Sequence, residues 1–149
     1  MPGQDIKLEI VGSQWGSGEE PQVIRVKTQG RLYRREDETV LTYDENEESG
    51  WGRTRTTLKI LNSGGIHLLR SGESRSKMEF VAGDRHMTQI NTPMGLLQMG
   101  LYTHEAKADL GLTRGDIRIR YSLDYANQDS VNMSLHVDYE TLEEPDASH

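Results

Sequence analysis

Apolar and polar residues alternate from Asp116 to Tyr139, with one interruption at residues 127–130. Successive side chains of a β-strand point to opposite faces, so each alternating run has one apolar face and one polar face. The pattern predicts a long antiparallel hairpin whose apolar face covers a core. The apolar positions are Ile117, Ile119, Tyr121, Leu123, Tyr125, Val131, Met133, Leu135, Val137 and Tyr139.

Shorter runs of the same kind occupy most of the remaining chain, and turn residues separate them. Gly30 lies inside one run, where a glycine typically marks a bend or bulge. Residues 44–52 (DENEESGWG) are acidic and predict a loop, whereas His104–Thr113 holds the only predicted helical turn, because EAKA at 105–108 contains fair helix formers. The predicted strands span residues 6–11, 22–29, 31–35, 39–44, 54–61, 66–71, 74–81, 87–91 and 96–103.

About ten short strands in one domain must either close on themselves or stack as two sheets. Successive hairpins with few long crossovers favour closure, which also removes exposed sheet edges. We therefore predict an all-β fold. It is a single closed antiparallel up-and-down β-barrel of about eight to ten strands, with at most one short helical turn. One domain spans residues 1–149, with a core at about 5–140 and a frayed tail at 141–149.

The composition narrows the class of protein further. Only 34% of the 149 residues are apolar, which suits strands that need an apolar residue at every second position. The chain has no cysteine, so it can form neither a disulfide nor a thiolate metal site. Its first residues lack the pattern of a signal peptide, and no apolar run is long enough for a membrane-spanning helix, so we expect a cytoplasmic protein without membrane contact. The net charge of −7 argues against nucleic acid as a partner.

Six short segments, taken in their order and spacing, resemble one family. They are Gly30–Tyr33, Leu41–Glu45, Thr57–Ile60, Leu69–Gly72, Met78–Phe80 and Gly115–Leu123. This series, which extends over residues 23–140, is similar to the YwiB-like family of small bacterial proteins of unknown function. The resemblance implies a lipocalin-like (calycin) β-barrel and implies no catalytic motif.

The sequence contains few of the motifs that are typical of catalytic or metal-binding sites. The five histidines have neither HxH nor HxxxH spacing, and the acidic segments 36–38 and 44–48 lack the spacing of a calcium loop, so both segments are read as solvated loops. Neither a GxSxG elbow nor a phosphate-binding loop is present. We therefore expect no enzyme, no metal site and no cofactor.

The barrel interior is the more informative place to look for a ligand. Arg70 shares the parity of Ile66 and Leu68, and a buried arginine requires a carboxylate, a ring of carbonyls or a bound anion. Tyrosines combine an apolar body with a polar tip, which suits the lining of a small-molecule site. The candidate ligand-binding residues are Arg70, Tyr33, Tyr43, Tyr121, Phe80 and, as a weaker candidate out of phase with its neighbours, Lys59. Other predicted lining residues are Leu58, Ile60, Leu68, Met99 and Leu123.

Two functions from different classes follow. In the first, a non-enzymatic barrel binds a small, partly apolar or amphipathic molecule, and its pocket of roughly 300 Å³ or more reaches Arg70. If the tyrosines only pack and Arg70 makes a structural bond at one end of the barrel, this function is lost. In the second, the outer surface binds protein or nucleic acid, most simply as a homodimer. Its candidate contacts are Tyr102, Trp51 and the Arg25–Arg31 stripe, which Arg118 and Arg120 would extend if their strands were neighbours.

Overall fold

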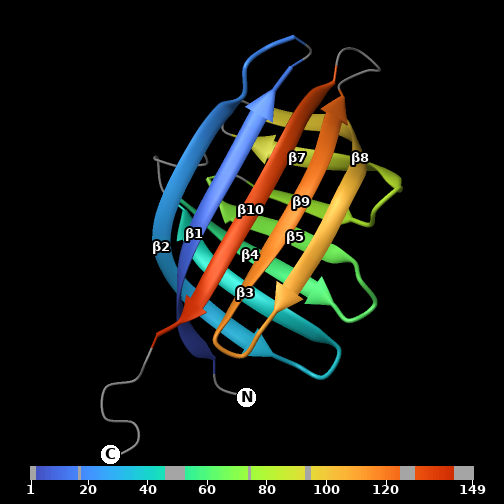
Figure 1. Ribbon diagram of the computed structural model, residues 1–149. Coiled ribbons are helices and arrows are strands. Elements are labelled where there is room, and N and C mark those ends of the chain that lie inside the picture. The colour runs from blue at the N-terminus through green and yellow to red at the C-terminus, as the bar shows by residue number, and fades with distance from the viewer. Residues whose placement is uncertain are drawn as a thin grey trace, which may run out of the picture.

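The computed structural model describes residues 3–16, 18–45, 53–73, 75–92, 95–124 and 130–142, the side chains of residues 90–92 excepted. Ten strands make up the described chain, and it contains no helix (Figure 1). They are β1 (Gln4–Trp15), β2 (Gln22–Arg34), β3 (Glu38–Glu45), β4 (Thr54–Leu61), β5 (Ile66–Gly72), β6 (Arg75–Phe80), β7 (Arg85–Thr92), β8 (Gly95–Leu110), β9 (Arg114–Asp124) and β10 (Val131–Thr141).

Each strand pairs in antiparallel fashion with its neighbours in the chain, and β1 also pairs with β10. The β1–β10 ladder runs from Ile6 opposite Thr141 to Trp15 opposite Asn132 and closes the barrel. The two ends of the described chain therefore lie side by side, as Figure 1 shows for the blue and red strands. This order confirms the predicted closed up-and-down barrel.

The apolar face of the alternating runs fills the barrel interior. Ile117, Ile119 and Val137 of the predicted hairpin are almost fully buried, and they pack into one cluster with Leu58 and Leu68 from the opposite wall. Burying one such side chain contributes about 1.5–3 kcal/mol, so this interior is the main source of stability. Tyr125, predicted on the same face, lies outside the described residues, as does Trp51.

Gly30 does not interrupt its strand, so the predicted break between residues 29 and 31 is wrong. β2 is continuous through Gly30, which pairs with Ile6 of β1 on one side and with Tyr43 of β3 on the other. A Cβ at this position would lie 2.1 Å from the carbonyl oxygen of Thr42. The glycine therefore permits close packing of β2 against β3 rather than a bend.

The predicted helical turn in His104–Thr113 is also wrong. β8 extends to Leu110 and pairs with β9 down to the Leu110–Gly115 pair, with a register shift between Thr103 and Glu105. Ala106 and Leu110 pack against the core from this extension. Pairing with β9 and burial of one face override the helix propensity of the segment, because intrinsic propensities amount to less than about 1 kcal/mol per residue.

The ends of the chain depart slightly from the prediction. Thr141, assigned to the frayed tail, is the last residue of β10, and the backbone N–H of Leu142 donates a hydrogen bond to the Asp5 carbonyl. Residues 143–149 lie outside the described part of the chain. Among the residues described, there is no helix with the length and apolar character that crossing a membrane would need.

Candidate functional site

A buried ion pair lies inside the barrel near one end. Arg70 Nε is 3.1 Å from Glu45 Oε2, and the two side chains are only 4% and 6% exposed. Glu45 ends β3 and Arg70 belongs to β5, so the two residues meet across β4, which lies between these strands. The parity argument thus placed Arg70 correctly inside the barrel, with a carboxylate as its partner.

The strand between the two partners supplies a further polar group. Thr56 of β4 is directly opposite Arg70 on one side and Tyr43 on the other, and its hydroxyl donates a hydrogen bond to Glu45 Oε2. Glu45 Oε2 therefore accepts one hydrogen bond from the Arg70 guanidinium and another from the Thr56 hydroxyl. Such bonds compensate the loss of water that burial of a charge would otherwise make very costly.

Two tyrosines adjoin this pair. Burial raises the pKa of Tyr43 well above the ordinary value of 10, and the negative charge of Glu45 raises it further, while Arg70 acts in the opposite direction. Burial also raises the pKa of Tyr121, again with partial opposition from Arg70. Both phenols are therefore neutral at physiological pH and retain their hydroxyl protons as hydrogen-bond donors.

A cavity of about 290 Å³ opens onto this group of polar residues. Arg70, Glu45 and Tyr121 contribute to its lining, and its other walls come from β1, β2 and β10. Most of its lining residues lie near the end of the barrel where β1 leads into β2, an end that is at the top of Figure 1. Its volume is close to the predicted 300 Å³, at the lower end for small-molecule sites. The remaining lining residues are Ile10, Gly12, Ser13, Gln14, Gln22, Ile24, Val26, Met133, Ser134 and Leu135.

The six candidate ligand-binding residues separate into three groups. Arg70 and Tyr121 line the cavity. Tyr43 is buried beside Thr56, and Phe80 lies in the core, with its ring centroid 4.8 Å from that of Tyr121. Tyr33 and Lys59 have the opposite parity from the buried Leu32, Leu58 and Ile60, so they are on the outer face and contribute nothing to this cavity.

The other predicted lining residues mostly fill space rather than border it. Leu58, Ile60, Leu68 and Leu123 are buried members of the core cluster, and Met99 packs against it. None of these five residues lines the cavity that Arg70 borders, whose open volume lies beside β1, β2 and β10. The alternating pattern of residues 131–139 identified part of this wall, namely Met133 and Leu135, but did not show that the interior is empty beside it.

Glu45 was missed because the acidic segment 44–48 was read as a solvated loop. That interpretation is wrong for Glu45, although its neighbour Asp44 is exposed and pairs with Arg55 on the outer face. The useful signal was parity: Glu45 continues the inward series of Leu41 and Tyr43. An acid in phase with buried residues, on a strand close to an inward arginine, indicates a buried pair.

The predicted arginine stripe is not continuous on the outer face. β2 and β9 are separated by β1 and β10, so Arg25 and Arg118 are not on neighbouring strands. Arg25 is opposite Val11, and Lys27 is opposite Glu9. Acidic side chains close to the arginines further reduce the positive electrostatic potential of this face. Arg31 pairs with Asp5 at 3.6 Å, and Arg118 pairs with Asp116 at 3.1 Å.

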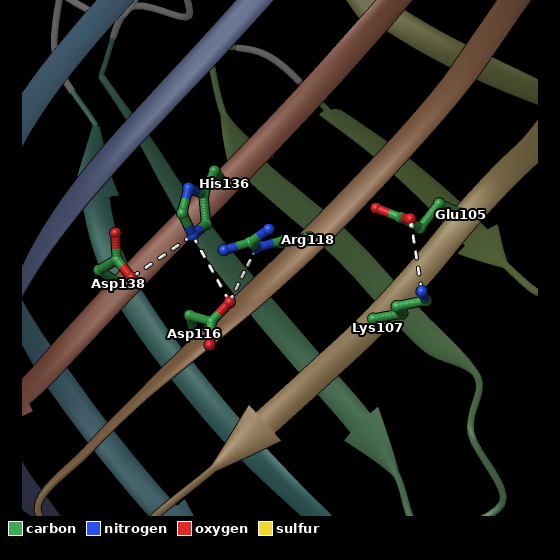
Figure 2. Close-up of polar contacts among 6 residues, drawn as sticks. All are labelled: Glu105, Lys107, Asp116, Arg118, His136 and Asp138. Atoms are coloured by element: carbon green, nitrogen blue, oxygen red, sulfur yellow. Dashed lines mark hydrogen bonds and ion pairs between the residues drawn. The ribbon is translucent and has the colours of Figure 1, made fainter.

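A group of potential metal ligands lies on the outer face of the β9–β10 hairpin (Figure 2). His136 Nε2 is 3.5 Å from Asp116 Oδ2 and 3.4 Å from Asp138 Oδ1. All three side chains are partly buried, and their ligand atoms lie within 4.8 Å of one another. A search for short sequence spacings could not find this group, because its members come from two strands.

Comparisons with known proteins agree with this architecture. The family model described as "Domain of unknown function (DUF1934)" matches residues 8–137. The chain is 25% identical over 119 residues to the "Uncharacterized beta-barrel protein YwiB" of Bacillus subtilis (strain 168), covering 80% of this chain and 82% of that protein. The crystal structure of the ywiB protein from Bacillus subtilis superposes with a TM-score of 0.81 at 22% identity, over 95% of this chain and 94% of that one. The structural match supports the barrel fold.

Proposed function

The chain belongs to the DUF1934 family, and we propose that it binds a small, partly apolar molecule inside the barrel without catalysing a reaction. Lipocalin-like barrels would use their interior in this way. The ligand would place its apolar part against β1, β2 and β10, and one polar group against Arg70, Glu45 and Tyr121. A cytoplasmic location is part of the proposal and is compatible with the absence of cysteine.

One observation carries this proposal: the cavity combines apolar walls with a buried, charged floor. Ile10, Ile24 and Val26 present hydrocarbon to the open space, whereas the guanidinium and carboxylate provide a donor and an acceptor at one place. Ligand sites generally have this composition, with a few polar groups that orient a mostly apolar molecule. A barrel interior that serves only for close packing would be filled by side chains at this place.

The same residues support binding rather than catalysis. The Arg70 guanidinium and the Glu45 carboxylate neutralise each other, and the two neighbouring phenols are held neutral. Within the described part of the chain, the cavity lining contains no histidine. The arrangement is therefore suited to holding a molecule in place.

Gly12 provides the sharpest test. It lines the cavity on β1, and no heavy atom lies within 4 Å of the position that a Cβ would occupy. The first atom of a new side chain therefore meets no neighbouring atom, and Gly12→Leu should reduce the volume of the cavity. We expect native mass spectrometry of freshly purified protein to show a bound small molecule, or titration with an environment-sensitive naphthalenesulfonate dye to show one saturable site. Gly12→Leu should weaken dye binding at least about tenfold, equivalent to about 1.4 kcal/mol.

The matched control is Val11→Leu, which enlarges the neighbouring side chain on the outer face of the same strand. Val11 is opposite His136 and Arg25, and it does not line the cavity, whereas its neighbours Ile10 and Gly12 do. Val11→Leu should leave dye binding unchanged. Equal dye binding by the wild-type and Gly12→Leu proteins, or no saturable binding by either, would reject the proposal.

A second candidate function uses the outer face of β7 and β8. Met87 is 63% exposed and Leu96 is 60% exposed, and Tyr102 is exposed on the same hairpin. Neighbouring exposed apolar side chains favour an interface, of which a homodimer is the simplest form. Light scattering of the wild-type and Met87→Glu proteins tests this candidate. A dimer that dissociates in the variant supports it, and a wild-type monomer at all concentrations removes it.

A further inference from the structure

Asp116 and Asp138 form a cross-strand pair on the outer face of the β9–β10 hairpin. Two like charges directly opposite each other destabilise a sheet unless something compensates them. The acidic row continues on both sides, because Asp109 of β8 is opposite Asp116 and Glu9 of β1 is opposite Asp138. Four acids on four adjacent strands thus concentrate negative charge at this point.

His136 lies diagonally from Asp116 and two residues before Asp138. Although its ring is partly exposed, the Nε2 atom is shielded from solvent, and it makes no hydrogen bond to any described residue. This nitrogen faces Asp116 Oδ2 at 3.5 Å and Asp138 Oδ1 at 3.4 Å (Figure 2). An imidazole nitrogen that faces two carboxylate oxygens supplies the donor set of a metal site.

The distances between the ligand atoms of Asp116, His136 and Asp138 are compatible with a tetrahedral ion. A tetrahedral Zn²⁺ with bonds of about 2.0–2.1 Å holds its ligand atoms roughly 3.3–3.4 Å apart. The two separations from His136 Nε2 are close to this value, and the third atom pair requires only a small side-chain rotation because all three atoms lie within 4.8 Å. Hard ions such as Ca²⁺ prefer six or more oxygen ligands, which this set does not supply.

The neighbouring cations pair with acidic side chains. Arg118 Nε donates a hydrogen bond to Asp116 Oδ2 at 3.1 Å, the same oxygen that faces His136, and hydrogen bonds of this kind orient ligating carboxylates. Lys107, the cross-strand neighbour of Arg118, pairs with Glu105 at 3.6 Å, as Figure 2 shows. Arg118 therefore orients a ligand, while the charge of Lys107 is directed toward another acid.

We propose that Asp116, His136 and Asp138 bind a divalent ion of the Zn²⁺ class on the outer face of the barrel. Three protein ligands leave a fourth position for water, and both carboxylates border an open groove of about 800 Å³ through which water reaches the ion. This site is separate from the interior cavity, because outward and inward residues of β9 and β10 point to opposite sides of the barrel wall. Its test is accordingly independent of the interior ligand.

Isothermal titration of the untagged full chain with ZnCl₂ provides the first measurement. We expect one saturable site per chain, and a loss of affinity of at least about tenfold in His136→Gln and in Asp138→Asn. The matched control is His67→Gln on β5, a histidine outside this group, which should bind Zn²⁺ like the wild type. Mg²⁺ at the same concentration should not compete.

A second measurement uses the wild-type protein alone, so it does not depend on the folding of any variant. Zn²⁺ should shift the imidazole nitrogen resonance of His136 selectively in NMR spectra, and Co²⁺ should give the visible absorption of a four-coordinate ion. Absence of saturable Zn²⁺ binding, binding retained in His136→Gln, or an unshifted His136 resonance would each overturn the proposal.

Discussion

Arg70 and Glu45 face each other inside the barrel from the two strands that flank β4, with Nε and Oε2 3.1 Å apart. The pair has two consequences. It holds opposite charges in the interior with almost no contact with water, and it forms the polar part of a cavity whose other walls are apolar. The stability of the barrel and the chemistry of the cavity therefore depend on the same two side chains.

Removing one member of this pair should be strongly destabilising. Arg70→Met leaves the Glu45 carboxylate buried without its ion-pair partner, and Glu45→Met does the same to Arg70, so each should lower the free energy of unfolding by about 3–5 kcal/mol. The double variant leaves no uncompensated charge and should cost clearly less than the sum of the two single changes. Urea unfolding of the four proteins measures this coupling, and additive effects would show that the pair does not interact as described.

The sequence predicted one half of this pair and not the other. The inward position of Arg70 followed from a two-residue period, which depends only on local geometry. Finding its partner required knowing that β3 and β5 flank β4 and that β3 continues as far as Glu45. Those are facts of strand order and strand length, and an acidic run such as 44–48 gives no local sign of where pairing ends.

Gly30 and Gly12 should respond very differently to the same small substitution. A Cβ at Gly30 would lie 2.1 Å from the Thr42 carbonyl oxygen and 2.9 Å from Leu8 Cδ1, so Gly30→Ala forces β2 and β3 apart. We expect a loss of about 1–3 kcal/mol. At Gly12 the Cβ enters open space, so Gly12→Ala should be neutral or stabilising by up to about 1 kcal/mol. Urea midpoints of the two variants provide the measurement, and equal midpoints would contradict the packing described at Gly30.

Buried tyrosines should make the barrel sensitive to alkaline pH. Tyr43 and Tyr121 have pKa values in the folded protein raised above the unfolded value of about 10, chiefly by burial. Their contribution to stability is thus fully present below pH 10. It is lost as pH rises beyond 10, because the unfolded chain then releases protons that the folded chain retains.

Each such tyrosine contributes a slope of up to about 1.4 kcal/mol per pH unit in this range. Urea unfolding at a series of alkaline pH values measures the slope directly. Tyr43→Phe should reduce it, whereas the stability difference between Tyr43→Phe and the wild type should stay constant between pH 6 and pH 9, roughly the range below the onset of ionisation. An unchanged alkaline slope in the variant would show that Tyr43 ionises as readily in the folded protein as in the unfolded chain.

The outer ligand group illustrates a second limit of inference from sequence. Asp116, His136 and Asp138 were all visible as polar positions of one predicted hairpin, but they lie up to 22 residues apart along the chain. Only the register, with Asp116 opposite Asp138 and Arg118 opposite His136, brings them together. Counting outward from the predicted interruption at residues 127–130 would not have given this register, because the observed pairs are symmetrical about residue 127. For residues 105–108 the error had another cause. Their local helix propensity predicted a helical turn, but pairing with β9 made them part of a strand.

The acidic row on the outer face should reduce the stability of the metal-free protein. Asp109 of β8 is exposed, and it stands directly opposite Asp116 without belonging to the proposed ligand group. Replacing it by asparagine removes one like-charge pair, and replacing it by lysine creates an attractive pair. In the presence of a chelator, Asp109→Asn and then Asp109→Lys should therefore raise the free energy of unfolding in steps of about 0.2–1 kcal/mol. Urea unfolding at low ionic strength measures the steps, and molar salt should largely abolish them because the charges are exposed. Stabilisation that persists undiminished in molar salt would mean that the gain comes from strand propensity at position 109 and not from relief of charge repulsion with Asp116.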